Sequence, residues 1–169
     1  MPSGPLAHVC FLVKDLDKAI EDWTKILGVL DPAQLEAPIV RYDRFEAGGD
    51  VMSWANFVNP GGCEIQLLCP LNEDGPLGKR LAKRGEGVHH ICFTTPDLEG
   101  SVDRLAEAGV ELTSRDLSQD PQVPWQWWTF VSPATSHGLL VEVAYPYRAV
   151  DGKWEPGEGV PVPAGDDDR

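Results

Sequence analysis

The amino-acid sequence predicts an α+β fold in which two tandem βαβββ modules form an incomplete barrel. A tetrapeptide occurs twice, as His-Val-Cys-Phe from His8 and as His-Ile-Cys-Phe from His90, with an offset of 82 residues. In each copy an Asp-Leu pair follows seven residues after the histidine, at Asp15 and Asp97. Each pair opens a stretch with apolar residues at helical spacing. Both halves also close alike, so the chain is interpreted as a tandem duplication.

The first module is expected over residues 6–69 and contains one helix and four strands. The helix shows apolar residues on one face and a glycine near its end, and the strands are apolar runs bounded by turn residues. An Asn-Pro-Gly-Gly turn separates the last two strands. In chain order, the strand, the helix and the three further strands are expected at residues 7–13, 16–27, 41–46, 51–58 and 63–68.

A connector over residues 70–87, with a short helix expected at 76–83, leads to the second module at 88–146. This module repeats the order of the first, with elements expected at residues 88–94, 98–108, 111–114, 126–132 and 139–144. The remaining residues, 147–169, are rich in proline and end in Asp-Asp-Asp-Arg. They are predicted to form an extended, acidic tail.

Size and charge limit the classes of function. The chain has 169 residues and a formal net charge of −13 at pH 7, which disfavours binding to nucleic acid or to an anionic membrane surface. It contains no apolar run approaching the roughly 20 residues that cross a bilayer, and no leader-like start. A soluble, cytoplasmic protein is therefore predicted. A disulfide between Cys10 and Cys92 is conceivable, but four free thiols suit a reducing compartment better.

Four side chains at equivalent positions of the two copies predict a metal site shared by the modules. His8 and His90 lie on the opening strands, and Gln66 and Glu142 lie on the closing strands, each four residues beyond a glycine. Modules packed about a pseudo-twofold axis bring these positions together. Two imidazoles, a carboxylate and an amide oxygen suit Co, Mn, Ni, Zn or Fe as a divalent ion. The adjacent His89 is expected to face the other way, because side chains alternate along a strand.

Local motifs carry a resemblance to a known family. The run Leu-Ala-Lys-Arg-Gly-Glu-Gly-Val-His-His-Ile-Cys-Phe at 81–93, and the segments 70–74 and 137–142, resemble the vicinal oxygen chelate superfamily, and within it the methylmalonyl-CoA epimerases. The resemblance covers about residues 6–146. It implies the same four metal ligands, a homodimer, and a metal-dependent isomerase or epimerase. The implied substrate is an acyl-CoA or another activated carbonyl compound.

The chemistry expected of such a site is enolate formation. A carboxylate cannot remove the proton next to a thioester unaided, and a Lewis acid on the carbonyl oxygen can contribute several kcal/mol. An epimerase also needs two acid/base groups on opposite faces of the carbon. Glu142 is expected to be one. The family places the other, a glutamate, on a middle strand of the first module, but residues 51–57 contain no carboxylate. Asp50 and Glu46, just upstream, are the candidates.

The tryptophans are a second departure from the epimerase pattern. Trp125, Trp127 and Trp128 lie on one expected strand, with Trp54 on the matching strand of the first module. By alternation, Trp125 and Trp127 share one face and Trp128 takes the other. Core packing is the ordinary explanation of large aromatics on a strand. An inward pair would instead shape a flat, apolar pocket that suits an aromatic or polycyclic substrate better than a short acyl group.

Three other functions remain open at this point. A glyoxalase-type lyase would use the same four ligand positions. An iron-dependent dioxygenase would use His8, His90 and Glu142 as its facial triad, although Gln66 as a fourth ligand argues against it. A non-catalytic small-molecule-binding protein would not need the metal ligands. A coenzyme-A-like substrate would also need a local basic patch; the candidate residues, which a solvated helix face explains equally well, are Lys79, Arg80, Lys83 and Arg84.

Overall fold

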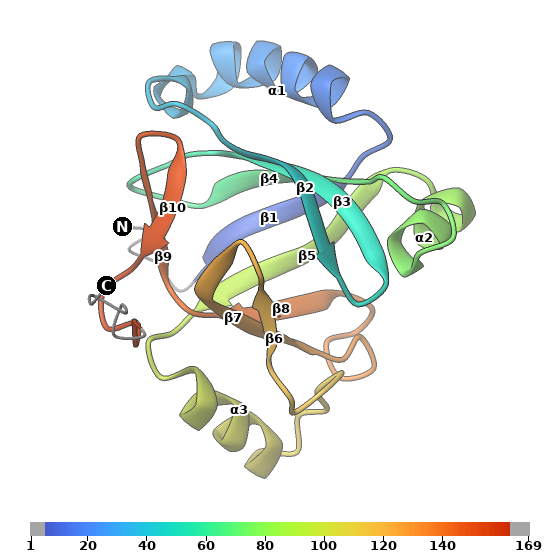
Figure 1. Ribbon diagram of the computed structural model, residues 1–169, viewed down its shortest axis with the longest axis vertical. Helices are drawn as coiled ribbons and strands as arrows, with labels where there is room; N and C mark the ends of the chain where they lie inside the picture. Colours follow the sequence, from blue (N-terminus) through green and yellow to red (C-terminus); the bar gives the residue numbers. More distant parts are fainter. Residues whose placement is uncertain (1–5, 163–169) are drawn as a thin grey trace, which may run out of the picture.

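One mixed sheet of eight strands organises the chain, and a computed structural model describes residues 6–162 of it. The strand order is β2-β3-β4-β1-β5-β8-β7-β6, and the sheet curls until it is nearly closed into a barrel (Figure 1). The side chain of Gln122 donates a hydrogen bond to the Arg44 carbonyl oxygen across the gap between the two edge strands. The predicted fold class is confirmed.

The elements follow the order expected from the repeat. Those of the first half are β1 (Leu6–Leu12), α1 (Leu16–Leu30), the 3-10 helix η1 (Pro32–Leu35), β2 (Val40–Ala47), β3 (Asp50–Phe57) and β4 (Glu64–Pro70). Those that follow are α2 (Pro76–Arg84), β5 (Gly87–Thr94), α3 (Leu98–Glu107), β6 (Ser118–Asp120), β7 (Val123–Val131), β8 (Leu140–Ala144), β9 (Tyr147–Val150) and β10 (Lys153–Pro156).

The opening strands of the two copies lie side by side at the centre of the sheet. β1 pairs antiparallel with β5, and the closing strands flank this pair, with β4 parallel to β1 and β8 parallel to β5. The register sets His8 opposite Cys92 and Cys10 opposite His90, as an approximate twofold axis between β1 and β5 requires. The duplication therefore brings the four predicted metal ligands onto four neighbouring strands.

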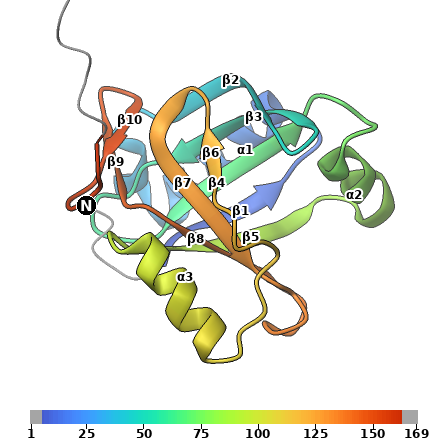
Figure 2. The same ribbon diagram turned by 60° about the horizontal axis from the view of Figure 1, so that its bottom comes forward.

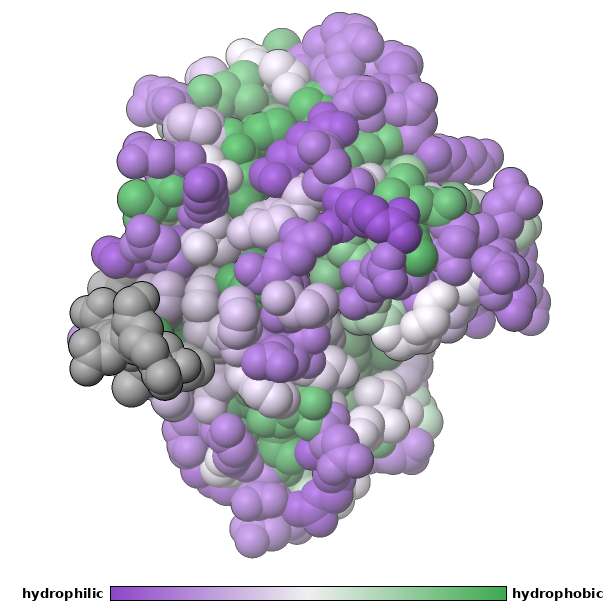
Figure 3. Space-filling model, viewed as in Figure 1, coloured by the Kyte–Doolittle hydropathy of each residue, from purple (hydrophilic) through white to green (hydrophobic). Residues whose placement is uncertain are grey.

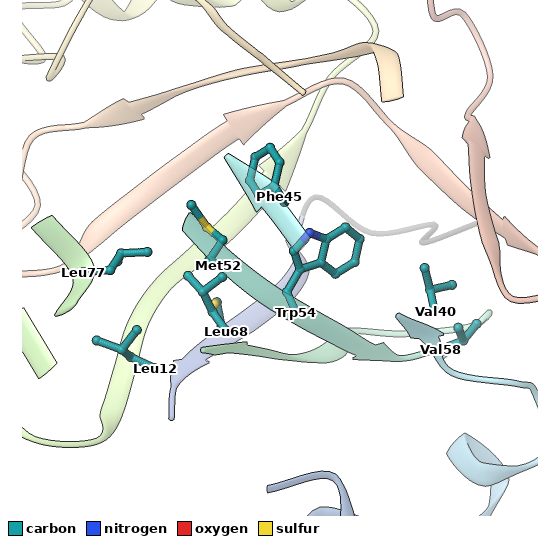
Figure 4. Close-up of a cluster of buried hydrophobic side chains, with 9 residues drawn as sticks. Leu12, Val40, Phe45, Met52, Trp54, Val58, Leu68 and Leu77 are labelled. Carbon is teal, nitrogen blue, oxygen red and sulfur yellow. The ribbon is translucent and has the colours of Figure 1, made fainter. Parts of the chain in front are cut away.

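Helices α1 and α3 cover the outer face of the sheet, whereas α2 lies at one end of it and contributes Leu77 to the interior (Figure 1). Asp15 caps α1 by accepting a hydrogen bond of 2.9 Å from the Lys18 backbone N–H, and the apolar side of α1 packs against β3 and β4. α3 packs Leu98 and Val102 against β7 and β8 in the same way. Inside the barrel, Leu12, Phe45, Met52, Trp54, Leu68 and Leu77 form part of a separate cluster (Figure 4).

Hydrophilic side chains cover most of the face seen in Figure 3.

The four cysteines are free, in agreement with the sequence-based prediction. Cys10 and Cys92 lie in the centre of the sheet and are fully buried. Within the described residues, no helix is both long and apolar enough to span a bilayer.

Two expected elements differ in the structure. Residues 111–114 form only an isolated bridge, Leu112 to Val131, and the edge of the sheet is β6 instead. The predicted extended tail begins with a hairpin, in which β9 pairs with β10. Tyr147 and Trp154 of this hairpin pack against Ala7, Cys92 and Ala144. The hairpin lies beside β7 (Figure 2), and β10 also contacts β2. The segment forms a hairpin in spite of its prolines because burial of its aromatic side chains against the sheet stabilises it. The acidic end, 166–169, lies outside the described residues.

Candidate metal centre

Three of the four predicted ligands converge at one point inside the barrel. His8 Nε2 on β1 lies 3.1 Å from His90 Nε2 on β5. Glu142 Oε2 on β8 lies 2.8 Å from His90 Nε2 and 3.4 Å from His8 Nε2. Bonds of about 2.0–2.2 Å to one ion place neighbouring donor atoms roughly 2.9–3.5 Å apart in octahedral or tetrahedral geometry. Both the spacing and the donor types therefore fit a divalent cation.

Gln66, the fourth predicted ligand, lines the same cavity from β4. Its Nε2 donates a hydrogen bond of 2.9 Å to Asn56 Oδ1, and Asn56 Nδ2 donates one of 2.9 Å to a carboxylate oxygen of Glu64. A carboxylate only accepts, so Glu64 dictates the orientation of both amides. This order turns the amide nitrogen of Gln66 toward Asn56 and leaves its oxygen, the atom that a metal needs, for the cavity.

Neighbouring side chains orient the two imidazoles. His8 Nδ1 lies 2.7 Å from the hydroxyl oxygen of Tyr147, and His90 Nδ1 lies 2.8 Å from His89 Nδ1. Tyr147 also lies close enough to Glu64 to help lower the pKa of its carboxyl group. Such outer partners fix the ring orientation and the tautomer of metal-binding histidines. Each pairing occupies the Nδ1 atom and turns the Nε2 atom toward Glu142.

Burial and mutual contact shift the pKa values of these groups. Burial lowers the pKa of His90, which favours the neutral imidazole that binds metals. Burial raises the pKa of Glu142, but the nearby His90 and His8 lower it more, so that it lies well below its ordinary value. Burial raises the pKa of Glu64 to about 6 and lowers that of His89 to about 3.

The prediction for His89 was wrong, because the strand contains a β-bulge. Pairing between β1 and β5 passes from Cys10 opposite His90 to Phe11 opposite Val88, so His89 has no partner in the register. A bulge interrupts the alternation of side chains and redirects one of them. As a result, His89 is buried, lines the same cavity as His90 and contacts it.

The two candidates for the second acid/base group lie in different environments. Asp50, at the start of β3, lines the cavity, is 8% exposed and accepts a hydrogen bond of 2.8 Å from the Leu77 backbone N–H. Its burial raises its pKa. Glu46 is exposed and pairs with Arg44, while Phe45 and Ala47 on either side of it line the cavity. The structure therefore brings Asp50 to the site and does not bring Glu46.

The tryptophan prediction was also wrong in part. Trp125 and Trp128 line the cavity, whereas Trp127 packs with the cluster under α3. The pairing of β6 with β7 is irregular, with Gln119 opposite Trp127 but Asp120 opposite Val123, so strict alternation fails along β7. Trp54 lines the cavity as well.

The sequence-based reasoning missed several residues at the site. Tyr147 and Trp154 come from the segment taken for a tail, and Asp120 comes from the unrecognised strand β6. Asn56 and Glu64 lie on correctly predicted strands. Their polar character, at inward positions of a buried strand pair, was a usable signal, because buried polar groups need partners.

Charge is distributed unevenly around the cavity. Its volume is about 360 Å³, and no lysine or arginine is among the described residues that line it. Its carboxylates are those of Asp50, Asp120 and Glu142. The basic residues of α2 lie outside, although Pro76 and Leu77 at the start of that helix form part of the wall.

Several known proteins are similar to this chain. It is 32% identical over 143 residues to the ethylmalonyl-CoA/methylmalonyl-CoA epimerase of Cereibacter sphaeroides, covering 83% of this chain and 96% of that protein. It is 31% identical over 143 residues to the mitochondrial methylmalonyl-CoA epimerase of Homo sapiens, covering 83% of this chain and 73% of the human protein.

Solved structures give the same picture. A methylmalonyl-CoA epimerase in complex with methylmalonyl-CoA and NH4+ superimposes with a TM-score of 0.63 and 27% identity, over 83% of this chain and 93% of the other. The epimerase of Mycobacterium tuberculosis gives a TM-score of 0.64 and 28% identity, over 84% and 87%. The family model of the Glyoxalase/Bleomycin resistance protein/Dioxygenase superfamily matches residues 7–122. The chain belongs to this superfamily, as its motifs predicted.

Proposed function

We propose that the chain is a divalent-metal-dependent isomerase or epimerase that moves the proton next to an activated carbonyl group. The convergence of His8, His90 and Glu142 within 3.4 Å, in the wall of a cavity, carries this proposal. With Gln66 they would hold an ion that stabilises the negative charge on the oxygen of an enolate. The similarity to methylmalonyl-CoA epimerases supports the reaction class.

Glu142 and Asp50 are the proposed acid/base pair. Glu142 remains ionised because the imidazoles lower its pKa, and its oxygens lie at the point where the carbonyl group would bind. β3 lines the cavity with Asp50, Met52 and Trp54, so Asp50 is the carboxylate that this strand offers. Its Oδ1 holds Leu77. Its other oxygen is the one proposed to exchange a proton with the substrate.

The substrate is proposed to be an acyl-CoA or a related activated carbonyl compound. Structures of similar proteins contain methylmalonyl-CoA or 2-nitronate-propionyl-CoA. α2 supports this choice for the present chain, because its first residues form part of the cavity wall and its later turns carry Lys79, Arg80, Lys83 and Arg84. Such a helix face suits the phosphates of a coenzyme outside the cavity.

Metal analysis followed by proton exchange tests the proposal. We expect the purified protein to contain, or to take up, about one equivalent of Co, Mn, Ni, Zn or Fe. In deuterated water the metal-loaded protein should then exchange the α-proton of methylmalonyl-CoA or of another enolisable thioester. The absence of any tight divalent-metal binding would contradict the proposal. Metal binding with ligand binding but no exchange in any thioester would favour a non-catalytic binding protein.

Replacing Asp50 by asparagine is expected to slow α-proton exchange by about 10²–10⁴-fold, the usual contribution of a general acid or base. The amide oxygen of asparagine can still accept the hydrogen bond from the Leu77 N–H, so the start of α2 should remain in place. Deuterium incorporation followed by NMR measures the effect. Glu46→Gln is the matched control, because Glu46 is exposed and lies away from the cavity. Equal exchange by both variants would remove Asp50 from the mechanism.

A further inference from the structure

The walls of the cavity beyond the candidate metal centre are large, aromatic and apolar. They come from β2, β3, β7 and β10, which are distant in sequence and meet because the sheet curls and the C-terminal hairpin folds back. These side chains are Phe45, Met52, Trp54, Trp125, Trp128 and Trp154. Figure 4 shows Phe45, Met52 and Trp54 together on the inner face of the sheet.

Neighbouring rings hold these walls in place. Trp54 stacks against Tyr42 with ring centroids 4.6 Å apart and against Trp154 at 6.1 Å, with an interplanar angle of 20° in both cases. Phe45 meets Trp128 edge to face at 6.2 Å. Rings fixed before a ligand arrives lose little conformational freedom when it binds. The cavity is therefore pre-shaped for a flat partner.

The charge of the cavity restricts its occupant further. Asp50 and Asp120 are 8% and 5% exposed, and no lysine or arginine of residues 6–162 joins them in lining the cavity. Each accepts hydrogen bonds from backbone N–H groups, with Asp50 bonded to Leu77 and Asp120 to Gln122. An anionic group held against these walls would face like charge in a poorly solvated space. A neutral group is therefore favoured over an anionic one.

We infer that the substrate carries, next to its reacting carbonyl, a neutral, flat and apolar group of about two fused rings. This inference rests on the proposed function for the position of the carbonyl, and on the cavity walls for the rest. A short branched acyl group would contact only part of this wall. A cavity of about 360 Å³ instead lies within the range of sites that enclose drug-sized ligands.

A series of neutral probes with the same oxygen pair and increasing size tests this inference. Catechol, 2,3-dihydroxynaphthalene and 2,3-dihydroxyanthracene share vicinal hydroxyl groups and differ by one ring at each step. Binding to the Zn²⁺-loaded protein is measured by quenching of tryptophan fluorescence or by calorimetry. We expect Kd to fall about tenfold or more for the first added ring, from burial of its apolar area. A sulfonate on the second ring should raise Kd by at least about tenfold. A Kd that is independent of ring number would overturn the inference.

Two neighbouring tryptophans provide the variant and its control. Trp128→Ala should remove most of the preference for the second ring, so that the Kd values of catechol and 2,3-dihydroxynaphthalene become similar. Trp127→Ala should keep the preference, because Trp127 belongs to the cluster under α3 and does not line the cavity. If Trp128→Ala does not fold, Trp125→Leu tests the same wall at a position nearer the start of β7. Loss of the preference in the Trp127 variant alone would also count against the inference.

The design separates this inference from the proposed function. If the protein binds metal and exchanges the proton of methylmalonyl-CoA, but Kd does not change along the probe series, the inference fails and the proposed function stands. If no metal binds, the proposed function fails, and the same series is measured on the metal-free protein. The aromatic walls do not depend on the ion, so the preference for two rings should persist there. Its absence in the metal-free protein would overturn the inference.

Discussion

Replacing His90 by alanine is expected to abolish metal binding and α-proton exchange together while leaving the fold intact. His90 Nε2 is within 3.1 Å of both other converging ligand atoms, so no other side chain of the cluster replaces it. Loss of a ligand should cost more than the 10–100-fold in affinity that loss of an outer partner typically costs. Metal content and a metal titration measure the loss of metal binding, and circular dichroism checks separately that the fold is intact.

His89 and His137 calibrate this experiment. His89→Ala should weaken metal binding by about 10–100-fold without abolishing it, because His89 orients His90 through the Nδ1 atom. His137 is exposed and does not line the cavity, so His137→Asn should leave metal binding unchanged; asparagine suits its backbone φ of 60°. Full metal affinity in the His90 variant would rule out the proposed centre, whatever the other two variants show.

The architecture was predictable because the sequence contains two copies of the same motif pattern. Equivalent motifs, 82 residues apart, mark equivalent strands, and the twofold relation then places His8 beside His90. Neither histidine alone would have indicated more than a buried polar residue. Their equivalence, together with that of Gln66 and Glu142, carried the prediction of a site.

The errors have a common physical origin in strand irregularities. Alternation of side chains predicts facing only where pairing is regular. A bulge in β5 redirects His89 into the cavity, and an irregularity in β7 between Val123 and Trp127 does the same for Trp125. A bulge depends on how two strands pair, which a single strand does not reveal. The hairpin at Tyr147 was missed for a related reason, because its stability comes from packing on strands that are distant in sequence.

Glu64 is expected to have a large effect on metal binding although it is not a ligand. Its carboxylate accepts a hydrogen bond from Asn56, which orients Gln66. It also lies near Tyr147, which contacts His8 Nδ1 and helps to lower the pKa of Glu64. When the Tyr147 hydroxyl donates to Glu64, its oxygen is left to accept from His8 Nδ1–H, so that His8 Nε2 is unprotonated and can bind a metal. One buried carboxylate is therefore expected to influence hydrogen bonding at two proposed ligands, through Asn56 at Gln66 and through Tyr147 at His8.

Glu64→Gln should lower metal affinity by about 10–100-fold with little change in shape. A glutamine amide accepts through its oxygen only and donates through its nitrogen, so a donor that faces the replaced carboxylate oxygen of Glu64 would meet an NH2 group instead of an acceptor. Calorimetric titration with Zn²⁺ and the visible spectrum of the Co²⁺-loaded protein measure affinity and geometry. Tyr147→Phe removes only the hydroxyl that contacts His8 Nδ1, so it should lower metal affinity by less than Glu64→Gln does.

Glu99→Gln is the matched control for this experiment. Glu99 on α3 also accepts a hydrogen bond from a tyrosine hydroxyl, that of Tyr145 at 2.8 Å, but neither residue lines the cavity. A general effect of removing a Glu–Tyr pair would appear in both variants as a lower melting temperature. Only the Glu64 variant should change the Co²⁺ spectrum and the Zn²⁺ affinity. Unchanged Zn²⁺ affinity in Glu64→Gln would show that the ligands hold their orientation without this carboxylate, and Glu64 would then be a buried acid without a role in metal binding.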